Sequence, residues 1–435
     1  MNSEKLNAII EKNKPRMLET LSSLIAVKSI AENKPDGIYP YGKPCAKALE
    51  LMLDATENMG FETKNYEYHV GTADWNSSLG KPQLGILCHL DVVPASPENW
   101  STDPFKMDIR DGCIYGRGAI DNKGPAVAVL YAMNAIKEAG IVLKKNVRFL
   151  FGCDEENGSS DIEYYLTKDK MPPMVFTPDG SYPVIHIEKG MLRFRFTKKY
   201  DGCISSMEAG TVPNAVPAYA EAVLKNGSRE FYTGLAAHAS TPELGDNAIT
   251  GLLTFISERN KCEDAIALST LFPHGYTGGE GLGIAANDKE SGRLTCVLSM
   301  MSVENDIMTC TADVRYPVCT TKEELLEKIG QKLSEYGFEM EILIASDPHK
   351  TPADSPFVQT LLSVYEEETG KKGNCIAIGG GTYVHDIEGG VAFGAEMPDY
   401  QYNMHGHDEH YPIDHLMAAT RMIAAAIIKI CGEEK

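Results

Sequence analysis

The sequence lacks a long hydrophobic run, a paired-cysteine motif and a surplus of basic residues, and each absence excludes a class of protein. No apolar stretch approaches the roughly 18 residues of a membrane-spanning helix. The polar, amphipathic N-terminal segment is not typical of a signal peptide. The 11 cysteines are scattered singly, without a C-x-x-C pair, so we expect reduced thiols. These features together predict a cytoplasmic protein.

Acidic residues outnumber basic ones and are spread along the whole chain. The sequence has 61 Asp and Glu against 41 Lys and Arg, which gives a formal net charge of −20. This balance disfavours nucleic acid and anionic membranes as partners. The 435 residues are enough for two domains, each with a hydrophobic core of its own.

The first part of the chain alternates between strand-like and helix-like patterns. Continuous apolar runs at 84–93 and 145–153 indicate buried strands. Helical spacing of apolar residues follows or precedes them at 43–59, 124–141 and 161–169. This order predicts an α/β domain with a mixed, largely parallel sheet and flanking helices. In such sheets, functional groups gather beyond the carboxyl ends of the strands.

From about residue 187 the pattern changes to that of half-exposed antiparallel strands. Two helical patterns lie among these strands, at 247–260 and 321–337. The α/β pattern returns after residue 350 and ends with a helix at about 413–431. We therefore predict a catalytic domain formed by residues 1–186 and 351–435, interrupted by an inserted α+β lid domain at 187–350.

Acidic and histidine residues recur where these strands and loops end. They occur in "CHLDVVP" (His89, Asp91), "GRGAIDNKG" (Asp121), "CDEENG" (Glu155, Glu156), "FTPDGSYP" (Asp179) and "MHGHDEHYP" (His405, His407, His410). Carboxylates and imidazoles that converge on one cleft repel each other or take up protons unless cations lie among them. Two divalent ions bridged by one carboxylate would satisfy this set. Histidine and oxygen ligands suit Zn²⁺, Co²⁺ or Mn²⁺.

The order of these motifs resembles that of the M20 family of di-metal peptidases, and within it the dipeptidase branch. The resemblance covers essentially the whole chain. It implies that Asp121 bridges both metals, that His89 and Asp179 complete the first site, and that Glu156 and His405 complete the second. It further implies that Glu155 is the general base and that Asp91 orients His89.

Two details of this assignment rest on the family pattern. The ligand histidine precedes an Asp/Asn-Glu pair by three residues, which selects His405 and leaves His407 and His410 as alternatives. The family commonly has a cis peptide after the bridging aspartate, so we expect Asp121–Asn122 to be cis.

The resemblance also assigns residues in and after the lid. His238, in "GLAAHASTPELGDNA", would stabilise the oxyanion of the tetrahedral intermediate. Asn214 would donate a hydrogen bond to the substrate, and Arg315 would pair with its C-terminal carboxylate. Backbone N–H groups of Gly379, Gly380 and Gly381 would approach the same carboxylate.

The leading interpretation is a metal-dependent dipeptidase that hydrolyses unblocked dipeptides through a metal-bridging water activated by Glu155. Two divalent ions per chain are expected, zinc first, with manganese or cobalt as alternatives. The enlarged lid of the dipeptidase branch supplies its histidine from the same chain, so we expect an active monomer. An N-acyl amino-acid deacylase with the same site is a second interpretation. A catalytically inactive peptide-binding relative is a third.

Overall fold

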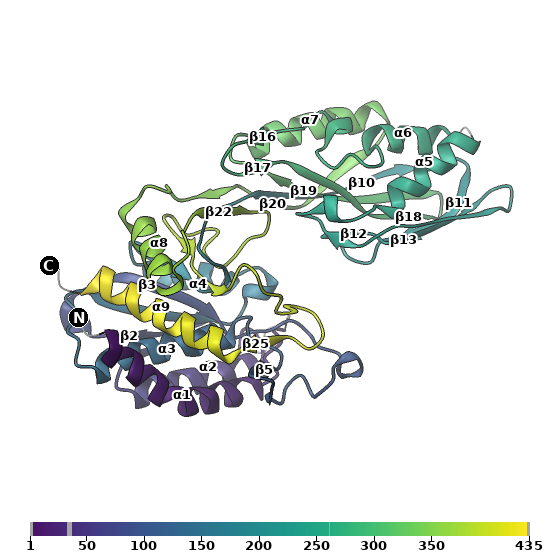
Figure 1. Cartoon of the computed structure of the whole chain (residues 1–435). Helices are drawn as coiled ribbons and strands as arrows, with labels where there is room; N and C mark the ends of the chain where they lie inside the picture. The colour runs from purple at the N-terminus through teal and green to yellow at the C-terminus, as the bar shows by residue number, and fades with distance from the viewer. Residues whose placement is uncertain (1–2, 33–36, 261, 433–435) are drawn as a thin grey trace. The chain divides into compact units, whose positions relative to one another are not determined.

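The computed structural model of the chain describes residues 3–32, 37–260 and 262–432. The chain divides into two compact units, which can be followed by residue number in Figure 1. The first unit comprises Met1–His186, Thr351–Ile376 and Thr382–Lys435, and the second comprises Ile187–Lys350 and Ala377–Gly381. A short segment that includes the glycine run thus belongs to the second unit.

The first unit is built on a nine-stranded mixed sheet whose order begins β1-β2-β6-β3-β7-β23-β9; the short strands β21 (His349–Lys350) and β22 (Cys375–Ile378) pair with β9. Its strands are β1 (Glu62–Tyr66), β2 (Val70–Asp74), β3 (Pro82–His89), β6 (Asn146–Gly152), β7 (Met174–Thr177), β9 (Val184–Glu188) and β23 (Val391–Ala392). The central strands β6, β3, β7 and β23 are parallel, and antiparallel strands flank them. His89 pairs with Gly152 in the register of β3 and β6, so both strands end at the same edge. Residues that follow these strands therefore meet there.

Helices cover both faces of this sheet, which explains the continuous apolar runs of its central strands. Ile86 and Cys88 pack on one face, and the alternate residue Leu87 packs on the other. The first face carries α1 (Ser3–Ile25), α2 (Lys43–Asn58), α3 (Lys123–Glu138), α8 (Pro356–Thr369) and α9 (Ile413–Cys431), and the second carries α4 (Ser160–Lys168). Helix α3 lies between α1 and α9 (Figure 1) and is buried from Lys123 to Ile136. Its alanines allow this close packing.

The second unit contains an antiparallel sheet with the order β14-β13-β11-β18-β19-β10-β20. Its strands are β10 (Gly190–Lys199), β11 (Ile204–Ala209), β13 (Tyr219–Leu224), β14 (Arg229–Thr233), β18 (Thr295–Glu304), β19 (Ile307–Tyr316) and β20 (Glu339–Ser346). Burial alternates along β10, where Phe194 and Phe196 join the core and Arg193 and Arg195 do not. The same core takes in residues of α5 (Ala248–Asn260), α6 (Glu263–Leu271) and α7 (Lys322–Glu335).

These elements confirm the predicted fold class, an α/β catalytic architecture with an α+β insertion. The helices expected at 43–59, 124–141 and 321–337 begin and end within three residues of α2, α3 and α7. A membrane-spanning helix was not expected. In the part of the chain that the structure describes, none of the helices combines the length and the apolar character needed to cross a membrane.

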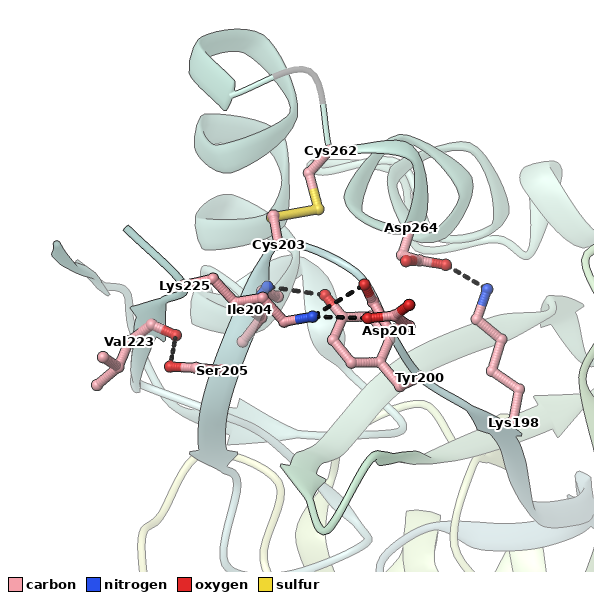
Figure 2. Close-up of a disulfide and its surroundings, with 10 residues drawn as sticks. All are labelled: Lys198, Tyr200, Asp201, Cys203, Ile204, Ser205, Val223, Lys225, Cys262 and Asp264. Atoms are coloured by element: carbon pink, nitrogen blue, oxygen red, sulfur yellow. Dashed lines mark hydrogen bonds and ion pairs between the residues drawn. A yellow bond between two sulfur atoms is a disulfide. The ribbon is translucent and has the colours of Figure 1, made fainter. Parts of the chain in front are cut away.

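The expectation that all cysteines are reduced is wrong for one pair. Cys203 and Cys262 form a disulfide in the second unit, with a Cα–Cα distance of 5.8 Å (Figure 2). Cys203 directly precedes β11, and Cys262 directly precedes α6. The two cysteines lie 59 residues apart in the sequence, so no short motif predicts their pairing. The start of α6 lies near the segment between β10 and β11, where Lys198 of β10 forms an ion pair with Asp264 of α6 (Figure 2).

Candidate active site

The candidate metal-binding side chains of the first unit follow the carboxyl ends of its parallel strands. His89 is the last residue of β3, and Glu155 and Glu156 form a 3₁₀ turn after β6. Asp179 follows β7, and Asp121 lies two residues before α3. The Asp121–Asn122 peptide is cis, as expected. The sheet thus brings together side chains from four separate segments at one edge.

Asp121 lies between two histidines and presents one carboxylate oxygen to each. Its Oδ1 lies 2.9 Å from His89 Nε2, and its Oδ2 lies 2.8 Å from His405 Nε2. Asp179 Oδ2 lies 3.4 Å from His89 Nε2, and Glu156 Oε2 lies 3.3 Å from His405 Nε2. The result is two acid–histidine clusters that share one carboxylate.

The structure separates the three neighbouring histidines of the C-terminal motif. Only His405 among them belongs to an acid–histidine cluster in the described residues. His410 stacks on Tyr115, and its Nε2 lies 3.0 Å from Tyr400 Oη. His407 is exposed. The structure thus places His405, and neither His407 nor His410, beside Asp121 and Glu156.

Buried polar atoms in the clusters fit a bound cation. Glu156 Oε1 is buried and has no hydrogen-bond partner among the described residues, and the buried His89 Nε2 faces the carboxylates of Asp121 and Asp179. Leaving such atoms unsatisfied is costly, especially on a carboxylate. Each belongs to a set of imidazole and carboxylate ligands whose atoms lie within 4.8 Å of one another. This donor set matches borderline divalent metals such as Zn²⁺, Co²⁺ and Mn²⁺.

The ionisation of the two clusters also fits bound cations. Burial, together with neighbouring carboxylates, raises the pKa of Glu155 well above its ordinary value. Hydrogen bonds to Asp121 and Glu156 raise the pKa of His405 to about 11. Burial opposes ionisation of Asp121, but hydrogen bonds from His405 and His89 hold its pKa below its ordinary value. Protons on the histidines thus compensate the carboxylates, which is the task that divalent cations would take over.

Asp91 organises the site through backbone groups as well as through His89. Its Oδ1 accepts a hydrogen bond from the N–H of Glu155 at 3.3 Å, and its Oδ2 accepts one from the N–H of Glu156 at 3.1 Å. The Nδ1 of His89 lies 3.0 Å from the backbone carbonyl of Asp91 and 3.5 Å from its carboxylate. The predicted orientation of His89 therefore uses the carbonyl of Asp91 more directly than its side chain.

Two buried residues that were not predicted from the sequence, Asp161 and Tyr383, also hold this turn in place. The buried Asp161 accepts hydrogen bonds from the N–H groups of Cys153 at 2.6 Å and Asp154 at 3.0 Å. The buried Tyr383 donates its hydroxyl to the same carboxylate, and its ring meets that of His89 edge to face. Burial raises the pKa of Asp161 to about 7. Asp161 lies outside the site motifs, and Tyr383 follows the glycine run by two residues without a role assigned to it, so neither contact was predicted.

A buried ion pair ties together the segments that carry Asp121 and His405. Arg117 Nη1 lies 2.5 Å from Glu409 Oε2, and Arg117 Nη2 donates to the carbonyl of Gly406 at 3.1 Å. The other oxygen of Glu409 accepts the backbone N–H groups of Ile120 at 3.1 Å and Asp121 at 3.4 Å. Both residues stand inside the quoted motifs, but the motifs alone do not reveal this contact.

We expect Arg117→Ala to lower the free energy of unfolding by about 3–5 kcal/mol, because it leaves a buried carboxylate without its partner. Burial already raises the pKa of Glu409 to about 7 with Arg117 beside it. Urea-induced unfolding followed by circular dichroism measures the change. Arg195→Ala is the matched control, since its ion pair with Glu341 is exposed. Equal losses for the two variants would contradict a special role for the buried pair.

The lid residues of the sequence prediction lie in the second unit, where two of them, Asn214 and His238, lie side by side. His238 ends the short strand β15 (Ala237–His238), which pairs with β12 (Ala215–Val216). Asn214 directly precedes β12, and its carbonyl accepts the N–H of Ala239 at 2.9 Å. His238 and Asn214 are both exposed on this unit. The pairing of β12 with β15 thus brings Asn214 beside His238.

Arg315 is buried on β19 and is held in a fixed orientation. Its Nε donates to Asp313 Oδ1 at 2.6 Å, and its Nη2 donates to Asp313 Oδ2 at 3.3 Å. Its Nη1 donates to the carbonyl of Gly379 at 2.9 Å. These bonds leave an N–H on each terminal nitrogen of the guanidinium for a ligand. They also link Arg315 to the glycine run named in the sequence analysis.

An α/β unit that carries two acid–histidine clusters with one shared carboxylate is the arrangement of a two-metal hydrolase. Comparison with known proteins gives the family. The profile described as "Peptidase family M20/M25/M40" matches residues 85–429, and the chain belongs to this family. The family resemblance inferred from the sequence motifs is therefore confirmed.

Individual relatives extend the comparison over the whole chain. The chain is 33% identical to the β-Ala-Xaa dipeptidase of Lactobacillus delbrueckii subsp. lactis, with 98% of each chain covered. The crystal structure of human carnosine dipeptidase 1 matches with a TM-score of 0.66 at 15% identity, covering 99% of each chain. The aminoacylhistidine dipeptidase of Vibrio alginolyticus matches with a TM-score of 0.63 at 12% identity, covering 96% of this chain and 97% of the other. These two structures share the fold of this chain.

Proposed function

We propose that this chain is a metal-dependent dipeptidase that hydrolyses the single peptide bond of unblocked dipeptides. The observation that carries the proposal is the pair of acid–histidine clusters that share Asp121. Glu155 directly precedes Glu156, which is a member of one of these clusters. A relative at 33% identity bears the name β-Ala-Xaa dipeptidase, which supports the same activity.

In this proposal, His89, Asp121 and Asp179 would hold one divalent ion, and Asp121, Glu156 and His405 would hold the second. Zinc is the first candidate, with manganese and cobalt as alternatives, because the donors are imidazole and carboxylate. When bound, such ions polarise the scissile carbonyl and make a water molecule more acidic. The chain's own residues then direct the proton transfers.

Glu155 is the proposed general base. It belongs to neither acid–histidine cluster, whereas its neighbour Glu156 belongs to one. Successive side chains leave a turn in different directions, so one glutamate can bind metal while the other faces the substrate. Glu155 accepts a proton from the attacking water and returns it to the leaving amine. Asp91 keeps this turn in place through its hydrogen bonds to the two backbone N–H groups.

The lid residues complete the proposal on the substrate side. His238 donates a hydrogen bond to the developing oxyanion, and Asn214 donates to the substrate backbone. Arg315 and the N–H groups of Gly379, Gly380 and Gly381 bind the C-terminal carboxylate. Because the carboxylate of a dipeptide lies one residue beyond the scissile carbonyl, binding at both points limits the length of the substrate.

C-terminal amidation of a dipeptide is expected to cost about 2–4 kcal/mol in kcat/KM, because it removes the charge that Arg315 recognises. Arg315→Ala should reduce the difference in kcat/KM between the dipeptide and its amide, because it impairs hydrolysis of the free acid more than that of the amide. Arg315→Lys keeps the charge but loses the planar fork, so it should restore only part of the preference. Steady-state kinetics on a dipeptide, its amide and the matching tripeptide measure these effects.

The same substrate set decides between the proposed function and its alternative. Equal kcat/KM on the dipeptide, amide and tripeptide would contradict a dipeptidase. Faster hydrolysis of N-acyl amino acids than of free dipeptides would indicate a deacylase instead. Substrates with an α- or a β-amino group on the first residue should both be included, given the name of the relative. A cytoplasmic location and activity as a monomer stay predictions.

A further inference from the structure

The second unit holds His238 in a turn with Ser240 whose hydrogen bonds define the state of the imidazole. Ser240 Oγ lies 2.7 Å from His238 Nδ1. The backbone N–H of Ser240 donates to the same nitrogen at 3.2 Å. From these two contacts we infer that Ser240 is a positioning residue that fixes the tautomer of His238 with its hydrogen on Nε2.

The backbone contact decides the direction of both hydrogen bonds. A peptide N–H can only donate, so Nδ1 of His238 must accept. A neutral imidazole that accepts at Nδ1 carries its hydrogen on Nε2. Protonating Nδ1 would place two N–H groups against each other, so this turn disfavours a hydrogen on Nδ1. The Ser240 hydroxyl, as the nearer of the two donors, strengthens this preference.

The backbone of the turn is anchored on both sides of Ala239. Its N–H donates to the carbonyl of Asn214 at 2.9 Å, and its carbonyl accepts the buried hydroxyl of Thr295 at 3.0 Å. The N–H of Thr241 also donates to the carbonyl of His238 at 3.0 Å. The distance between His238 and Ser240 is therefore set by a rigid local structure.

Ser240 is further confined by the glycine run. A Cβ added to Gly379 would lie 2.5 Å from Ser240 Cβ, so the backbone of Gly379 passes directly against Ser240. The carbonyl of Gly379 in turn accepts a hydrogen bond from Arg315. A continuous chain of contacts in one unit thus links Arg315 to the turn that carries His238.

The inference rests on the proposed function in one respect: the Nε2 hydrogen is the donor that His238 would offer to the oxyanion. A ring with its hydrogen on Nδ1 would present an acceptor to the oxyanion and stabilise nothing. Ser240 therefore acts through His238 rather than on the substrate.

Imidazole ¹⁵N NMR tests the tautomer without any assay of activity. Protein labelled with ¹⁵N-histidine is compared with its His238→Gln variant, which identifies the His238 signals by their loss. We expect a protonated Nε2 and an unprotonated Nδ1 in the wild type. In Ser240→Ala, where only the backbone donor remains, we expect a measurable fraction of the other tautomer. A wild-type His238 with its hydrogen on Nδ1, or an unchanged tautomer in Ser240→Ala, would overturn the inference.

A double-mutant cycle tests whether Ser240 acts through His238. Ser240→Ala should lower kcat by about tenfold, the lower end of the loss when a histidine's outer hydrogen-bond partner is removed. KM and metal content should stay unchanged. In a His238→Ala background the same substitution should have no further effect. Ser205→Ala is the matched control, because Ser205 is exposed and donates only to the carbonyl of Val223 (Figure 2).

Equal losses of kcat from Ser240→Ala in the wild-type and His238→Ala backgrounds would overturn the inference, because the serine would then act independently of the histidine. A wild-type protein that hydrolyses no dipeptide would contradict the proposed function. The NMR result would then decide the role of Ser240 alone.

Discussion

Glu155→Gln is expected to lower kcat by about two to four orders of magnitude, the usual contribution of a general base. The substitution keeps the size of the side chain but removes its ability to accept a proton. Metal content should not change, because Glu155 contributes to neither acid–histidine cluster. Steady-state kinetics on a dipeptide measure kcat, and metal analysis of the same preparation measures the metal content.

Glu156→Gln is the matched control, since it stands next to Glu155 and belongs to the cluster of Asp121 and His405. We expect this variant to lose metal from one site and to lose activity in consequence. If Glu155→Gln lost metal while Glu156→Gln retained it, the two roles would be the reverse of those proposed.

His238→Ala is expected to lower kcat by about two to three orders of magnitude, the cost of removing one oxyanion donor. His238 belongs to neither acid–histidine cluster found in the described residues, so metal content should not change. Kinetics of the pure variant, with its metal content measured in parallel, give the result. An unimpaired His238→Ala variant would remove this residue from the reaction.

Mixing variants tests whether the histidine acts in its own chain. A His238→Ala protein and a Glu155→Gln protein each lack one function and retain the other. If each chain is active alone, the mixture should be no more active than its components. Recovered activity in the mixture would show that His238 serves a partner chain.

The sequence predicts the fold well because its signals are local. The apolar run of 84–93 and the helical spacing of 124–141 depend on neighbours in the chain, and β3 and α3 follow from them. The disulfide of Cys203 and Cys262 was missed because its two cysteines lie 59 residues apart and meet only in the folded second unit. Pairings over such a separation leave no periodic pattern.

The residues of the candidate site likewise divide into those that the sequence predicts and those that only the fold reveals. His89, Asp121 and His405 could be named because each stands in a short motif, and the structure brings them within reach of one another. Asp161 stands in no such motif, and Ser240 lies in the quoted segment around His238 without a role assigned to it. Their roles depend on hydrogen bonds with or from backbone N–H groups, whose direction the sequence does not encode. The supporting residues of the site therefore become visible only in the fold.

Metal removal and reloading is the measurement that tests the central claim most directly. The protein is treated with a chelator, dialysed, and assayed on a free dipeptide before and after addition of Zn²⁺, Mn²⁺ or Co²⁺. We expect no turnover in the metal-free protein, recovery with at least one of the three ions, and two bound ions per chain at full activity. Full dipeptidase activity in protein shown to contain no metal would contradict the account.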